Sequence, residues 1–125
     1  MEWRIDFAPD GSRMTVTAWG PAEASGFIAY LLEAVNHPAW RPGIPALMDF
    51  RDLDIGRLGA ADAWQVADQH QPYAKILAAA PIAVVVSRPV DFGMVRMWES
   101  LVHQMHLAHE VFYAMAEAEA WLQDR

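Results

Sequence analysis

The chain has 125 residues, of which 54% are hydrophobic and 20% charged, and it contains no cysteine. This length suits one domain with a proper core, and the lack of cysteine excludes disulfides, thiolate metal sites and cysteine nucleophiles. A formal net charge of −7 disfavours binding to nucleic acid or to an anionic membrane surface, because both require basic patches. No apolar run approaches the roughly 20 residues of a membrane span. We therefore expect one cytoplasmic domain over residues 1–125.

The first part of the chain predicts an antiparallel hairpin followed by a helix and a third strand. Apolar and polar residues alternate over residues 1–8 and 13–18, and a Pro-Asp-Gly-Ser turn signal separates the two segments. Pro21 suits the first turn of a helix whose apolar positions recur to residue 35. Residues 44–50 are typical of a strand, and residues 53–59 are expected to be irregular.

The second part predicts alternating helices and strands. Residues 60–80 are mostly helical in pattern, and Pro72 should kink or divide them. The unbroken apolar run within residues 81–87 indicates a strand covered on both faces. The order ends with a turn at residues 90–93, a helix over 92–107, a short strand over 110–113 and a helix over 114–123. The prediction is an α/β domain with a mixed sheet of about five strands, an N-terminal antiparallel hairpin and about four helices.

Five segments carry a family resemblance in consistent order. They are HPAWRPG at 37–43, LMDFRDL at 47–53, AVVVS at 83–87, FGMVRMW at 92–98, and Val111-Phe112 together with AEAWL at 118–122. This set resembles the bacterial SpoIIAA-like family, whose members are relatives of the STAS domains of anti-sigma-factor antagonists. The resemblance implies a STAS-like fold. Antagonists of that kind carry a phosphorylatable serine after the third strand, but residues 49–59 contain no Ser or Thr, so the phosphorylation switch is not assigned to any residue here.

Polar side chains follow the third and fourth predicted strands and form the first candidate site. In open α/β sheets ligands collect at this edge, and the amino end of the following helix favours an anion. Arginines there are suited to bidentate binding of a carboxylate or phosphate. The predicted ligand-binding residues are Asp49, Arg51, Asp52, Ser87, Arg88, Asp91 and Arg96. The alternative is a surface ion-pair network in which Asp91 merely caps the helix.

Two further groups of residues are candidates for binding. Glu99, His103, His106 and His109 combine histidines with a carboxylate, as zinc sites do, but their spacing matches no known ligand signature and equally suits a solvated helix face. Aromatic and methionine side chains suit either an apolar ligand pocket, ordinary core packing or a dimer patch. They are Phe27, Tyr30, Trp64, Met94, Met97 and Trp98. His70 is expected on a helix surface.

The sequence favours a non-enzymatic binding or regulatory module for a protein partner or a small anionic or apolar ligand, without cofactor or metal. It contains neither a glycine-rich phosphate loop with its lysine nor a Gly-x-Ser-x-Gly elbow. One alternative is a small hydrolase or isomerase with Asp49 or Asp52 as the base. Another is a structural homo-oligomer, such as a homodimer, formed through exposed Trp or Met residues.

Overall fold

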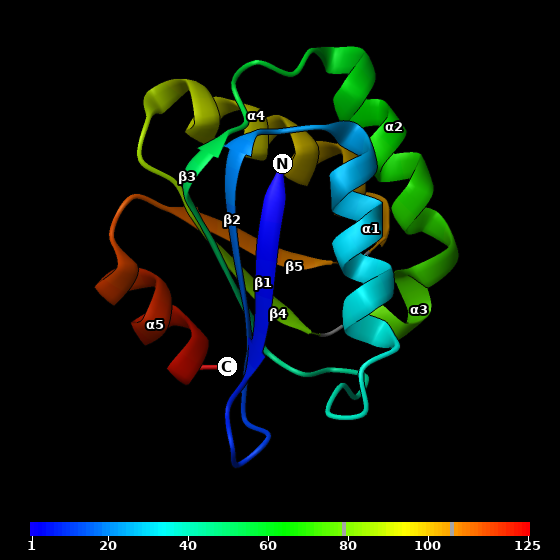
Figure 1. The fold of residues 1–125 in the computed structure, drawn as a ribbon, viewed down its shortest axis with the longest axis vertical. Coiled ribbons are helices and arrows are strands. Elements are labelled where there is room, and N and C mark those ends of the chain that lie inside the picture. Colours follow the sequence, from blue (N-terminus) through cyan, green and yellow to red (C-terminus); the bar gives the residue numbers. More distant parts are fainter. Residues whose placement is uncertain (79, 106) are drawn as a thin grey trace.

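Five strands form one sheet in the order in which they follow along the chain (Figure 1). The computed structural model describes residues 1–78, 80–105 and 107–125. The strands are β1 (Glu2–Phe7), β2 (Met14–Pro21), β3 (Ala46–Asp54), β4 (Pro81–Val85) and β5 (Ala108–Phe112). β1 pairs antiparallel with β2, and all later neighbours pair in parallel. The predicted α/β fold with an N-terminal hairpin and a mixed sheet is therefore confirmed.

The helices cover the two faces of the sheet unequally. They are α1 (Ala24–Val35), α2 (Ala60–His70), α3 (Ala74–Leu77), α4 (Pro89–Val102) and α5 (Met115–Gln123), with short 3-10 turns η1 (Gln71–Tyr73) and η2 (His103–Met105). Helices α1 and α2 lie on one side of the sheet and α5 on the other (Figure 1). Pro72 separates α2 from α3, as predicted, because proline lacks the donor that a continuous helix requires. Within the described ranges, no helix is long and apolar enough to cross a bilayer.

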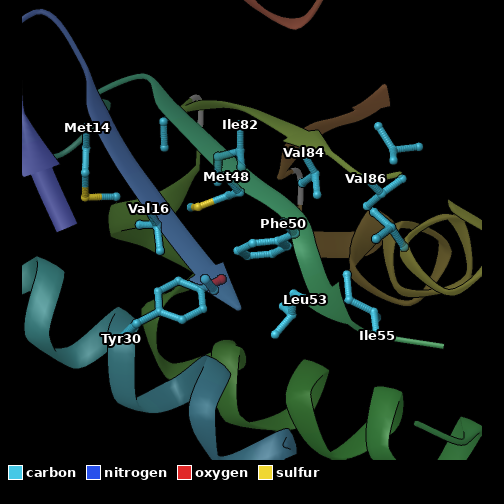
Figure 2. Packing of buried hydrophobic residues seen from close by; sticks show 14 of the residues in the cluster. Met14, Val16, Tyr30, Met48, Phe50, Leu53, Ile55, Ile82, Val84 and Val86 are labelled. Carbon is cyan, nitrogen blue, oxygen red and sulfur yellow. The ribbon is translucent and has the colours of Figure 1, made fainter. Parts of the chain in front are cut away.

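Alternate residues of the central strands supply two separate cores. On one face, side chains such as Val16, Phe50 and Val84 pack with Tyr30 of α1 and Val95 of α4 (Figure 2). On the other face, Leu47, Ala83 and Val85 pack beneath Ala118 and Leu122 of α5. All five residues of β4 are buried, which confirms a strand covered on both faces.

Several predicted boundaries are wrong. Pro21 ends β2, and α1 begins only at Ala24, so Pro21 does not lie in the first turn of the helix. β3 continues to Asp54, where irregular backbone was expected from residue 53, because β2 shifts register after Thr17 and still pairs with this extension. α4 begins at Pro89, so the expected turn at residues 90–93 is the first turn of the helix, where proline is well suited. The helix ends at Val102, and β5 begins at Ala108, two residues earlier than predicted.

Candidate functional site

The ends of β3 and β4 meet at one edge of the sheet, as the sequence predicts. The Ser87 hydroxyl, which follows β4, donates to the Arg51 carbonyl oxygen of β3 at 2.7 Å. Beside it, Arg51 donates to both carboxylate oxygens of Asp49 at 2.8 Å each. These bonds from Arg51 hold the pKa of Asp49 below its usual range. A carboxylate stabilised in its charged form by an arginine is a weak general base at neutral pH.

Asp91 is the buried centre of a second group at this edge. Its side chain has no exposed surface, and it accepts hydrogen bonds from Arg88 Nε at 2.8 Å, Arg88 Nη2 at 2.9 Å and the Gly56 backbone N–H at 2.8 Å. Arg88 also donates to Asp54. Arg88 occupies the N-cap position of α4, so Asp91 is not the helix cap that the alternative interpretation assigns to it. Instead, its carboxylate ties the segment after β3 to the first turn of α4.

The predicted site residues therefore form two neighbouring groups. The first group contains Asp49, Arg51 and Ser87, and the second group contains Arg88 and Asp91. Asp52 is exposed on β3. Arg96 lies two turns further along α4, with its Nη1 3.8 Å from Glu110 Oε1 of β5. Both Arg51 and Arg88 already bind carboxylates, so an anionic ligand would have to compete with those partners. That these seven residues bind a ligand stays a prediction.

Sequence reasoning missed two members of the Asp91 group. The sequence pattern predicts irregular structure for Asp54 and Gly56, whereas Asp54 ends β3 and Gly56 supplies a backbone donor. A Cβ at Gly56 would lie 2.6 Å from Val90 Cγ1, so the glycine permits close packing of this segment on α4. The Asp52-Leu53-Asp54 alternation is strand-like, but it is out of phase with Met48 and Phe50 because the register of β3 against β2 shifts between them.

A largely apolar cavity of about 100 Å³ lies between the sheet and helices α1, α2 and α4. Side chains of strands β2, β3 and β4 line it, among them Met14, Met48 and Val84. Figure 2 shows Met48 and Val84 beside Phe50. Several lining residues are small, namely Ala34, Ala46, Ala63 and Ala80. Small side chains on facing elements leave space that the surrounding residues do not fill. An engineered apolar cavity of roughly 150 Å³ admits benzene, so the smaller volume here limits a ligand to about one aromatic ring.

Three rings form a polar end of this cavity. His70, Trp98 and His109 all line it, and the Trp98 ring lies edge-on to both imidazoles, with ring centroids 5.4 Å from His70 and 4.6 Å from His109. The His70 Nδ1 lies 2.8 Å from the Val66 carbonyl oxygen. Burial lowers the pKa of His70 and lowers that of His109 to about 3. Both imidazoles are therefore neutral at neutral pH.

The expected surface position of His70 is wrong. His70 is only 6% exposed, because it shares the inner face of α2 with Ala63, Val66 and Ala67. The apolar residues proposed for a pocket divide into two sets. Phe27, Tyr30, Met94 and Trp98 line the cavity, whereas Trp64 and Met97 are not among its lining residues. Trp64 follows Ala63 by one position, which turns it about 100° away on the helix, and it is 57% exposed.

A shallow polar hollow lies on the other side of His109. Its lining includes Arg96, Glu99, His103, His109 and Glu110. Burial and the nearby Glu110 carboxylate raise the pKa of Glu99 to about 7. The candidate zinc set falls partly in this hollow, with His109 on β5 rather than on α4.

The zinc candidate gains no support from the described residues. Among residues 1–78, 80–105 and 107–125, no group of three or more His, Cys, Asp or Glu side chains is arranged to hold a metal ion. His106, the fourth member of the predicted set, lies outside these ranges.

Comparison with known proteins identifies the fold. A solved structure of an uncharacterised protein from the DUF3478 family, with a SpoIIAA-like fold, from Shewanella loihica PV-4, superposes with a TM-score of 0.61. The match covers 97% of this chain and 92% of that one, at 20% sequence identity. No protein-family model matches the sequence, and no curated protein matches it significantly. The chain thus has the SpoIIAA-like fold that the five sequence segments implied, and a fold by itself assigns no activity.

Proposed function

We propose that this domain is a non-enzymatic binding module that takes up a small apolar molecule in the cavity between the sheet and helices α1, α2 and α4. The observation that carries the proposal is the cavity itself. Protein interiors rarely leave voids larger than a water molecule. An empty apolar space of about 100 Å³ costs about 2 kcal/mol of folding free energy, and a bound apolar ligand recovers part of that cost.

The chemistry of the surrounding side chains supports binding rather than catalysis. His70 is buried and His109 is half-buried in a largely apolar setting, and the Ser87 hydroxyl is engaged by the Arg51 backbone. The SpoIIAA-like fold is compatible with a binding or regulatory role.

The edge of the sheet is the weaker candidate for a ligand site. Arg51 and Arg88 are the groups that would hold an anion, and each is already bidentate with a carboxylate. Displacing Asp91 from Arg88 would leave a carboxylate buried without its charged partner, which is unfavourable. The cavity requires no such rearrangement.

Isothermal titration calorimetry with toluene tests the proposal. Ala34 lines the cavity from α1, so Ala34→Leu should fill it and abolish binding. The matched control Ala29→Leu lies on the same helix at a position outside the cavity lining and should bind as the wild type does. Absence of saturable binding to the wild type, or unchanged binding to Ala34→Leu, would contradict the proposal.

A further inference from the structure

Four buried polar side-chain atoms have no hydrogen-bond partner in the part of the chain that the structure describes. They are Gln69 Oε1, Trp98 Nε1, Glu99 Oε1 and His109 Nδ1. Buried polar atoms are nearly always paired, and unpaired ones point to an unseen water, ion or ligand.

These four atoms belong to one region of the molecule. Gln69 precedes His70 at the end of α2, Trp98 and Glu99 are consecutive on α4, and His109 is on β5. The Trp98 ring contacts the rings of His70 and His109, which joins the three elements. Trp98 and His109 line the apolar cavity, while Glu99 and His109 line the polar hollow outside it. Two residues that line the cavity, Trp98 and His109, thus each carry a buried polar atom without a partner among the described residues.

The unpaired atoms require a group that both accepts and donates. Of the four residues with unpaired atoms, Trp98 and His109 line the cavity and Gln69 and Glu99 do not. The indole N–H of Trp98 is a donor only. Neutral His109 has Nδ1 as an acceptor when its proton is on Nε2. A ligand hydroxyl has one O–H donor and two lone pairs, and it matches this set.

Charged ligand groups match the region less well. A carboxylate offers only acceptors, so it has no hydrogen to donate to His109 Nδ1. An ammonium group has no lone pair for the Trp98 N–H. A charge of either sign would also lose hydration in a largely apolar cavity.

We propose that the ligand of the cavity carries a hydroxyl group on an apolar body of about one aromatic ring, as a small phenol does. The hydroxyl oxygen accepts from Trp98 Nε1–H, and the hydroxyl hydrogen is donated to His109 Nδ1. The cavity volume of about 100 Å³ limits the apolar body. This inference rests on the proposed function, because it assigns the polar group of the molecule that the cavity takes up.

Calorimetry with phenol and toluene tests the inference, since the two differ by a hydroxyl in place of a methyl. Trp98→Phe removes the N–H donor and retains an aromatic ring. In Trp98→Phe, the ratio of the toluene to the phenol dissociation constant should fall by about tenfold, because phenol loses one hydrogen bond. The ratio should be unchanged in the control Trp64→Phe, which lies on the exposed face of α2.

A second measurement avoids dependence on the folding of the variant. In the wild type, the indole ¹H–¹⁵N signal of Trp98 should move downfield on addition of phenol and not on addition of toluene. Two results overturn the hydroxyl assignment alone. In the first, toluene binds while the ratio of the toluene to the phenol dissociation constant is the same in Trp98→Phe as in the wild type. In the second, toluene binds while phenol causes no specific shift of the Trp98 signal. Failure of both molecules to bind overturns the proposed function and this inference with it.

Discussion

Asp91 provides the sharpest test of how the edge of the sheet is held together. Asp91→Ala removes the carboxylate that binds the Gly56 N–H and the Arg88 guanidinium. The Gly56 N–H is partly buried, and loss of a hydrogen bond to a charged acceptor costs about 2 kcal/mol. Arg88 contributes little to this loss, because its side chain is 49% exposed and keeps Asp54 as a partner.

Asp49→Ala is the matched control. Asp49 also binds an arginine through two hydrogen bonds at the same edge, but its partner Arg51 is 49% exposed and lies only two residues away. Its removal should cost less than about 1 kcal/mol. Asp91→Asn should fall between the two alanine variants, because its amide oxygen still accepts from Gly56.

Urea unfolding followed by circular dichroism measures these differences. For a chain of this length, 2 kcal/mol corresponds to a fall in Tm of about 8 °C, so thermal unfolding provides a second reading. Equal losses for Asp91→Ala and Asp49→Ala would refute the reasoning, since it depends on the burial of Asp91 and on its bond to the next segment.

Two further predictions concern packing and protonation. Gly56→Ala should lose about 1 to 3 kcal/mol of unfolding free energy, because its Cβ would press against Val90. Combining it with Val90→Ala should restore part of that loss. Gly93→Ala, whose Cβ would meet open space on α4, should be neutral or stabilising in the same urea assay. The pKa of His109 is about 3 in the folded protein, so the unfolded chain binds a proton below pH 6.5 and the folded protein does not. Between pH 6.5 and pH 5, the unfolding free energy of the wild type should therefore fall by about 2 kcal/mol more than that of His109→Leu. Equal pH dependence of the two proteins in urea titrations would show that His109 does not cause this loss of stability.

The sequence predicts those features that depend on local pattern. The alternation in the hairpin, the apolar run of β4 and the break at Pro72 each leave a periodic or steric signal. The meeting of Arg51 with Ser87 follows from parallel strands ending at one edge.

The remaining features depend on partners that are remote in sequence. The extension of β3 rests on a register shift in β2, and the burial of Asp91 rests on Gly56, 35 residues earlier. On α2, residue type favours Trp64 inside and His70 outside, but the helical phase set by Ala63 and Val66 reverses both. The cavity is a deficit of volume between packed elements, which no single segment encodes.

The methyl signals of the methionines test uptake of an apolar molecule most directly. Met48 and Met94 line the cavity, whereas Met115, the first residue of α5, packs against the core on the opposite face of the sheet. In a ¹H–¹³C titration with toluene, the signals of Met48 and Met94 should show saturable shifts with one dissociation constant, and the signal of Met115 should not move. A Met115 response equal to theirs, or none from any methionine up to the solubility limit of toluene, would contradict it.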